Sequence, residues 1–259
     1  MSKCNPVATP LEQGVKYYKT TDDDVQFDTN IYQRAIGSLT YAATCTRPDI
    51  SAAVSALSQF MSNPSETHWT GIKRILRYLR GTTSYGLVYD GKDCGELYGF
   101  SDADWAGDVN TRRSTSGYVF RFGNSSITWC SRRQQTVAKS STEAEYVSLS
   151  SATQELIWLR RLLSGLGISF DTPTTVYEDN QGAIDIAKNP KHHDRTKHID
   201  ICHHFVRERV ALNEVAVVHC PTENMTADIL TKGLGTVKYR KFRDGLGVFD
   251  VDRFVRGTG

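Results

Sequence analysis

The sequence lacks any long hydrophobic run, and this absence argues against a membrane-spanning helix. The stretch Ile50–Pro64 carries no charge, but it is rich in serine and too short to cross a bilayer. No apolar run follows Met1, so we expect no signal peptide and a protein that is not secreted. We therefore expect no membrane among its partners.

Closely paired cysteines are missing as well. None of the 6 cysteines forms a Cys-x-x-Cys motif, and their spacing is not that of a small disulfide scaffold. A chain of 259 residues can bury a sizeable core without covalent cross-links. These features favour reduced thiols, and a cytoplasmic or nuclear protein, over the alternative of a disulfide-bonded one.

A strong net charge is absent too, because the formal charge is only +2. Proteins that bind nucleic acid are often strongly basic, so any such contact here must come from local clusters. Arg112 and Arg113 are the best candidates, and Arg132, Arg133 and Lys139 are further ones. For each of them, ordinary surface charge is an equally good interpretation.

The first third of the chain is predicted to be helical after a polar start. Residues 1–30 show no period, which predicts an extended, poorly packed lead-in. Residues 31–84 are predicted to form a three-helix segment, whose third helix is capped at Asn63. The stripe expected to be buried on the first helix consists of Ile31, Ala35, Leu39 and Ala42. On the third helix, Lys73, Arg77 and Arg80 share a face that either meets solvent or contacts phosphates.

Strand patterns begin near Tyr85 and predict a second, larger domain over residues 85–240, followed by a tail over 241–259. Alternating residues on both sides of Gly123-Asn124 predict a hairpin. A long helix over 140–163 follows, and then come a strand, helices, another strand and a last helix. Antiparallel strands followed by strands that helices separate predict a mixed sheet, and hence a mixed α/β fold.

Two aspartates lie where such a sheet can bring them together. Asp102 lies in the first long strand, and Asp179 ends a later strand just before a helix. Open α/β sheets place ligands at the carboxyl ends of their strands. If the two strands are neighbours, both carboxylates meet at one place.

The long helix adds a glutamate. Leu149, Ala152 and Leu156 form its apolar stripe, and extending that stripe back by four residues reaches Glu145. A carboxylate on a buried stripe is costly unless it has a partner. Glu143 lies about 200° around the helix from Glu145 and is therefore predicted to face water.

Asp228, in the first turn of the predicted last helix, is a fourth acidic candidate, although an acid at a helix start is common for electrostatic reasons alone. Several carboxylates that converge repel each other unless a cation lies among them. A set made only of oxygen ligands suits Mg²⁺ or Mn²⁺ better than Zn²⁺. Two such ions can support hydrolysis of a phosphodiester.

These residues lie within several motifs in fixed order: "SDADWAGD", "RRSTSGYVF", "VAKSSTEAEYVSLS", "YEDNQGAI", "RTKHID" and "PTENMTADILTKGL". Together they resemble the C-terminal ribonuclease H domain of copia-type retrotransposon polyproteins. The preceding "YQRAIGSLTYAATCTRPDISAAVSALSQFMSNPSETHW" resembles the segment between the polymerase and the ribonuclease H domain of the same polyproteins. The resemblance covers nearly the whole chain.

The resemblance implies a ribonuclease H-like five-stranded mixed sheet flanked by helices, and cutting of the RNA strand of an RNA–DNA hybrid with two Mg²⁺ or Mn²⁺ ions. The acids that match the family's catalytic and metal-binding positions are Asp102, Glu145, Asp179 and Asp228. Asp104 and Glu143 are the alternatives one step away. The implied partners are the hybrid and a reverse transcriptase polymerase domain, in a cytoplasmic virus-like particle or the nucleus.

Histidines are the main departure from the family pattern. Many ribonucleases H carry a histidine in the loop before the last helix, but here that loop is "CPTENMT". His198 is a candidate substitute, although no geometric argument supports it. The histidine-rich stretch around it lacks the repeated spacing of a zinc site, so we favour packing and basic contacts there.

Two other hypotheses compete with an active nuclease. One is a catalytically inactive nucleic-acid-binding or scaffolding remnant of a truncated polyprotein, against which the complete set of acids argues. The other is an unstable truncation whose helical segment has lost its polymerase partner and exposes apolar patches.

Overall fold

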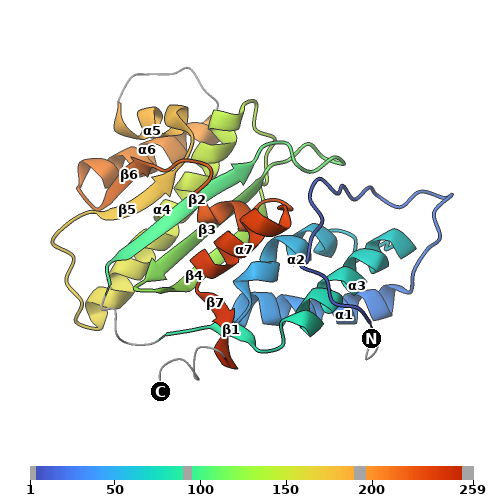
Figure 1. The fold of residues 1–259 in the computed structure, drawn as a ribbon. Helices are drawn as coiled ribbons and strands as arrows, with labels where there is room; N and C mark the ends of the chain where they lie inside the picture. The colour runs from blue at the N-terminus through green and yellow to red at the C-terminus, as the bar shows by residue number, and fades with distance from the viewer. Residues whose placement is uncertain (1–3, 90–94, 190–196, 253–259) are drawn as a thin grey trace.

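The computed structural model describes residues 4–89, 95–189 and 197–252, with the backbone alone for 197–201 and 203. The first part is helical, as predicted, and contains α1 (Thr29–Cys45), the short 3₁₀ helix η1 (Pro48–Ile50), α2 (Ser51–Ser58) and α3 (Glu66–Gly81). Helix α3 is capped by Ser65 and His68 rather than by Asn63. These helices pack beside the sheet (Figure 1).

The buried stripe of α1 differs from the predicted one. Its buried residues are Tyr32, Ile36, Leu39 and Ala43, whereas Ile31 is 47% exposed. The tyrosine at the start of the stripe sets the register, because its ring is fully buried and its hydroxyl donates to the carbonyl of Leu57 at 2.9 Å.

Five strands form the main sheet, in the order β4-β3-β2-β5-β6. Strands β2, β3 and β4 are antiparallel, and β5 and β6 run parallel to β2. Their bounds are β2 Leu97–Asp104, β3 Thr115–Phe122, β4 Ser125–Arg133, β5 Thr174–Glu178 and β6 Val215–His219. The predicted mixed sheet and the hairpin turn at Gly123-Asn124 are confirmed.

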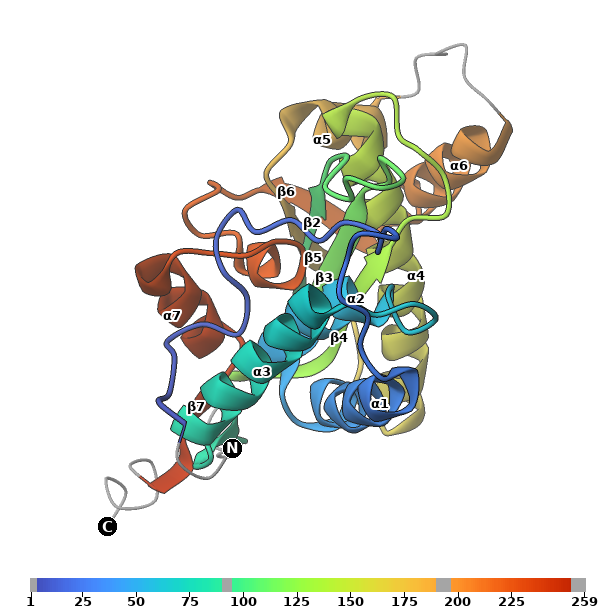
Figure 2. The same ribbon diagram turned by 90° about the vertical axis from the view of Figure 1, so that its right-hand side faces the viewer.

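Helices cover both faces of the sheet (Figures 1 and 2). The long helix α4 (Ser141–Gly165) packs on β2 and β3, and α5 (Gln181–Lys188) and α6 (Lys197–Ala211) pack beside it. The other face meets α2 and the 3₁₀ helix η2 (Thr226–Leu230). The fold is thus a five-stranded mixed sheet flanked by helices, as expected.

The described parts of both terminal segments pack more closely and hold more regular structure than the sequence predicts. In the lead-in, Val7, Leu11 and Tyr17 pack against the core, so the expectation of poor packing was wrong. Helix α7 (Thr236–Gly245) and strand β7 (Val248–Asp250) follow η2, and β7 pairs with β1 (Tyr85–Leu87) to form a second, two-stranded sheet. The domain boundaries at 30, 84 and 240 stay predictions.

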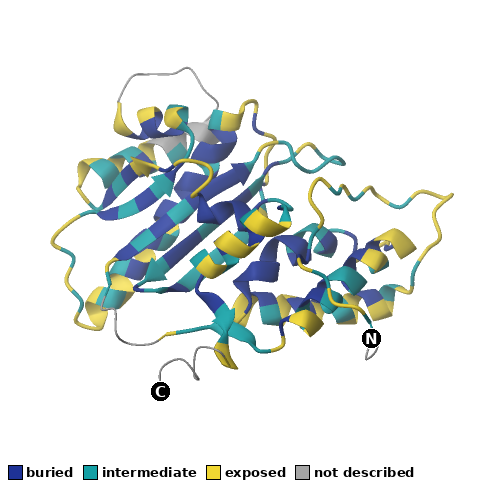
Figure 3. Ribbon diagram, in the orientation of Figure 1, coloured by how far each residue is buried: buried dark blue, intermediate teal, exposed yellow. Residues whose placement is uncertain are grey.

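Two large cores hold the molecule together (Figure 3). One lies between the sheet and helices α4, α5 and α6. The other joins the helical segment to the opposite face of the sheet, to η2 and to α7. Among the described residues, every helix is too short or too polar to span a lipid bilayer.

Candidate active site

Asp102 and Asp179 meet because their strands are parallel neighbours. Strand β2 pairs with β5 as far as Phe100 and Tyr177, and both aspartates follow two residues beyond that pair. Asp102 is only 1% exposed. The prediction that these two carboxylates come together if their strands are adjacent is confirmed.

Glu145 joins them from α4. On the next turn of this helix, the Ser148 hydroxyl donates to the backbone carbonyl of Asp102 at 2.8 Å, which fixes the helix against β2. Carboxylate oxygens of Asp102, Glu145 and Asp179 all lie within 4.8 Å of one another. Among the described residues, this is the group of acids, histidines or cysteines whose spacing suits a metal ion. Asp104 and Glu143 lie outside it.

Glu143 does not face water, so that prediction was wrong. It is 9% exposed, and its Oε2 accepts a hydrogen bond from the backbone N–H of Lys139 at 3.0 Å. The loop before α4 folds back over the first helical turn, where Ser140 caps the helix. The glutamate therefore anchors this loop instead of lying on an open face.

Glu178 was missed by the sequence analysis. It is fully buried, its Oε1 accepts from the backbone N–H of Asn180 at 3.2 Å, and its Oε2 has no hydrogen-bond partner in the described part of the chain. The signal was the alternation of β5, in which Thr174, Val176 and Glu178 are all buried. The position of Asp179 at the end of the strand pattern predicts only that acid as a ligand.

Asp228 lies beside the three-acid cluster but is held by lysines. It belongs to the 3₁₀ helix η2, not to the longer helix that was predicted. Its Oδ1 lies 2.8 Å from Lys232 Nζ, its Oδ2 is paired with Lys238, and Lys232 Nζ also lies 3.7 Å from Asp102 Oδ2. The Thr231 hydroxyl donates to the same Asp102 oxygen. The structure thus places Asp228 near Asp102 through a shared lysine, and sequence reasoning missed that lysine.

The protonation of this cluster follows from its burial. Burial raises the pKa of Asp102 to about 7. The positive charge of Lys232 lowers this pKa, and the negative charges of Asp228 and Asp179 raise it. Burial also raises the pKa of Glu145 to about 11, with Asp102 and Glu178 adding to the effect. The pKa of Glu178 is raised well above its usual value, again chiefly by burial. Without a further cation, the cluster therefore retains protons at neutral pH.

The cluster fits a hard divalent cation. All its donors are carboxylate oxygens, which Mg²⁺ and Mn²⁺ prefer. Glu145 Oε2 is buried and has no hydrogen-bond partner among the described residues. A bound cation would satisfy that oxygen and offset the repulsion that raises the pKa values.

The predicted nucleic-acid-binding residues do not all line the same groove. Arg113, Arg132 and Arg133 line one groove between β4 and the helical segment. Arg112 is exposed in the loop before β3, with a left-handed φ of 58°, and Lys139 is exposed before α4. Their role in binding stays a prediction. His198 and most of the histidine-rich stretch around it lie outside the described side chains, and His204 is exposed.

Comparison with curated proteins shows which sequences this chain is similar to. The chain is 42% identical over 253 residues to a retrovirus-related Pol polyprotein from transposon TNT 1-94 of Nicotiana tabacum, covering 96% of this chain and 19% of that protein. It is 41% identical over 251 residues to the Pol polyprotein from transposon RE2 of Arabidopsis thaliana, covering 97% and 17%. Over nearly its whole length, the chain is similar to copia-type Pol polyproteins. It spans less than a fifth of the length of these two Pol relatives.

A shorter relative is secreted RxLR effector protein 161 of Plasmopara viticola, which is 54% identical over 128 residues, covering 49% of this chain and 90% of that protein. No protein-family model matches the chain. Among solved structures, LC11-RNase H1 in complex with an RNA/DNA hybrid is 14% identical with a TM-score of 0.39, covering 52% of this chain and 94% of that chain. The foamy viral protease-reverse transcriptase in complex with an RNA/DNA hybrid is 14% identical with a TM-score of 0.45, covering 78% and 26%.

Proposed function

We propose that this chain is the ribonuclease H part of a copia-type Pol polyprotein and cuts the RNA strand of RNA–DNA hybrids in a metal-dependent reaction. The observation that carries the proposal is the convergence of the buried Asp102 and Glu145 with the partly exposed Asp179, whose carboxylate oxygens all lie within 4.8 Å of one another. In such a polyprotein the chain would work beside a polymerase domain, in a cytoplasmic virus-like particle or in the nucleus.

In this proposal each acid has a task that its position allows. Asp102, Glu145 and Asp179 would hold divalent cations, and Asp228 would contribute from η2 on the side of Lys232. When bound, Mg²⁺ or Mn²⁺ would activate a water and stabilise the leaving oxygen of a phosphodiester. The hydroxyl of Thr231 and the ammonium of Lys232 orient the Asp102 carboxylate from the side of η2.

The test is cleavage of a labelled RNA–DNA hybrid in the presence of Mg²⁺. We expect cleavage of the RNA strand by the wild-type chain and a loss of at least about a hundredfold in Asp102→Asn, since this change keeps the side-chain shape but removes a charged ligand. Equal rates for the two proteins would refute the assignment. Tight hybrid binding by the wild type without any cleavage would instead favour an inactive binding remnant.

A further inference from the structure

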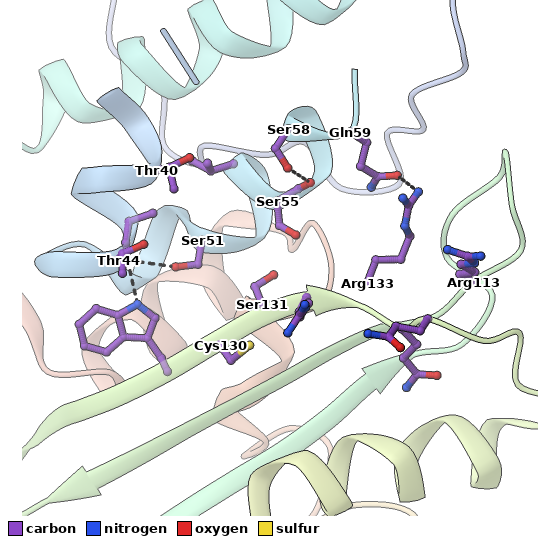
Figure 4. Close-up of a pocket in the computed structure, with 16 residues that line it drawn as sticks. Thr40, Thr44, Ser51, Ser55, Ser58, Gln59, Arg113, Cys130, Ser131 and Arg133 are labelled. Carbon is purple, nitrogen blue, oxygen red and sulfur yellow. Dashed lines mark hydrogen bonds between the residues drawn. The ribbon is translucent and has the colours of Figure 1, made fainter. Parts of the chain in front are cut away.

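An open groove lies between the helical segment and the edge strand of the sheet. Its volume is about 590 Å³, and its walls come from α1, α2, β4 and the loops next to β4 (Figure 4). The Trp129 ring nitrogen joins the two sides at its base by donating to the carbonyl of Ala43 at 2.8 Å. The groove is therefore built by both parts of the chain together.

The charged residues that line this groove are all of one sign. Arg113, Arg132 and Arg133 line it, and no aspartate or glutamate does, although the whole chain has a net charge of only +2. Arg133 is held in place by Gln59 of the opposite wall and by Asp108, whose Oδ2 lies 2.8 Å from its Nη1. Asp108 thus offsets the charge of Arg133, but no ion pair holds Arg113 or Arg132 within the described part of the chain, and these two guanidinium groups favour an anionic ligand.

Hydroxyl groups complete the lining, which includes Ser55 and Ser58 of α2 and Ser131 of β4 (Figure 4). One polar atom of the wall, Ser131 Oγ, is buried without a hydrogen-bond partner among the described residues, whereas the Gln134 side chain is turned toward α4, where its Nε2 donates to the carbonyl of Ala144 at 2.8 Å. Buried polar groups in proteins are nearly always paired. This unused hydrogen-bonding capacity indicates a ligand that offers both acceptors and donors, as phosphate oxygens and sugar hydroxyls do.

The groove is aligned with the acid cluster. In the sheet, Asp102 pairs with Gly117 and Gly117 pairs with Ser131, so all three lie in one row across the strands. Neighbouring strands are about 4.8 Å apart, which places the backbone of Ser131 roughly 10 Å from that of Asp102. A second cavity, lined by Ser55 and Gln59 as well as by Asp104 and Lys232, lies between the groove and the acids.

We propose that this groove binds the sugar–phosphate backbone of the hybrid while the acid cluster acts on its RNA strand. The inference rests on the proposed function and extends it, because it assigns part of substrate binding to the helical segment. A nucleic-acid backbone fits better than an isolated phosphate, since the arginines of the groove come from more than one element, Arg113 from the loop before β3 and Arg132 from β4. The phosphates concerned belong to either strand of the hybrid, and the test distinguishes the two.

The experiment compares two variants that lose the same charge. Arg113→Gln with Arg132→Gln removes two groove arginines, and Arg34→Gln with Arg161→Gln removes two exposed arginines outside the groove. Binding of a fluorescent RNA–DNA hybrid is followed by anisotropy in EDTA, which prevents cleavage, over a range of salt concentrations. We expect the groove variant to bind about tenfold more weakly at low salt and to lower the slope of log affinity against log salt by about 2. The control variant should match the wild type.

Ser131→Ala gives a second measurement that separates binding from folding. Because Ser131 Oγ has no hydrogen-bond partner in the described protein, its removal should leave the melting temperature unchanged and still weaken hybrid binding. Hybrids with uncharged methylphosphonates in one strand identify the source of the phosphates. The difference in hybrid-binding affinity between the wild type and the groove variant should vanish only when the strand that lies in the groove carries the uncharged methylphosphonates.

The outcomes separate this inference from the proposed function. If the wild type cuts the hybrid while the groove and control variants bind it equally well, the groove assignment is overturned and the nuclease stands. If the wild type binds without cutting and the groove variant binds more weakly, the groove is supported and the nuclease is not. If the wild type does neither, both fail.

Discussion

Lys232 places a positive charge at the edge of the acid cluster. Its ammonium lies 2.8 Å from Asp228 Oδ1 and 3.7 Å from Asp102 Oδ2. Although burial opposes it, the charges of Asp102 and Asp228 raise the pKa of Lys232, so this lysine stays charged at neutral pH. A fixed cation beside these carboxylates competes with a divalent ion for them.

Replacing Lys232 should therefore strengthen metal binding. We expect Lys232→Met to bind Mn²⁺ about tenfold more tightly than the wild type, a modest factor because the lysine side chain is 34% exposed and partly screened. Isothermal titration calorimetry with Mn²⁺ measures this change directly. Lys238→Met is the matched control, because Lys238 pairs with Asp228 and not with Asp102, and it should show a smaller effect. Unchanged or weaker binding by Lys232→Met would contradict the argument.

The acids were easier to predict from the sequence than the residues around them. Asp102 and Asp179 stand out because each lies at or near the carboxyl end of a strand pattern, and Glu145 because it extends an apolar stripe. Lys232 has no such signal, since four residues after an acid it looks like an ordinary surface pair. Its role appears only when η2 is folded against β2, a contact between residues more than a hundred positions apart.

At the scale of elements, the position of η2 depends on one glycine in the sheet. Gly117 of β3 lies beneath η2, and a Cβ added there would come within 2.6 Å of Thr231 Cγ2 and 2.9 Å of Leu230 Cβ. The same threonine donates its hydroxyl to Asp102. The missing side chain therefore allows η2 to bring Asp228 and Lys232 close to the acid cluster.

Gly117→Ala should push η2 away from the sheet. We expect the free energy of unfolding to fall by about 1–3 kcal/mol, as in other overpacked cores, together with weaker Mn²⁺ binding. Urea unfolding and calorimetry measure the two effects. In the control Gly37→Ala, on α1, the new Cβ meets nothing within 4 Å, and alanine should stabilise that helix by up to about 1 kcal/mol. Wild-type stability in Gly117→Ala would show that η2 does not pack on β3 in this way.

The elements themselves were largely predictable, but their registers were not. The hairpin, the long helix and the mixed sheet follow from turn residues and periodicity within each segment. The stripe of α1 was placed one residue too early, because Tyr32 and Ile31 both satisfy a helical period and only packing on α2 chooses between them. Glu143 was misplaced because its partner, the backbone of Lys139, belongs to a loop without a period.

At the scale of the whole molecule, the helical segment and the sheet share one core. Ile36, Leu57 and Ile72 of the helices belong to the same cluster as Val119 of β3 and Phe242 of α7. A hydrogen bond joins the two parts as well, because the hydroxyl of Tyr239 on α7 donates to the backbone carbonyl of Asp49 in η1 at 2.9 Å. We therefore expect one cooperative unfolding transition, so that a change at the acid cluster alters the stability of the whole chain.

That transition should depend on pH, and divalent cations should counteract this dependence. In the metal-free folded protein, the pKa of Asp102 is raised to about 7 and that of Glu145 to about 11, whereas in the unfolded chain both carboxyls titrate near their usual values of 3.8 and 4.5. Above those usual values the folded state binds more protons than the unfolded one, so stability falls as pH rises. The stabilisation that protonated Asp102 provides is lost progressively as the pH rises to about 7. The stabilisation from protonated Glu145 is lost as the pH rises further, to about 11.

Thermal unfolding in EDTA should therefore show a lower melting temperature at pH 9 than at pH 6. Mg²⁺ binds the ionised carboxylates, so it should raise the melting temperature more at pH 9 than at pH 6. Asp102→Asn with Glu145→Gln removes both titrations and the ligands, so this variant should lose the Mg²⁺ effect and most of this pH dependence while keeping the shape of the site. An equal gain from Mg²⁺ at both pH values in the wild type would mean that these carboxyls are already ionised without the ion, and that burial does not hold their protons.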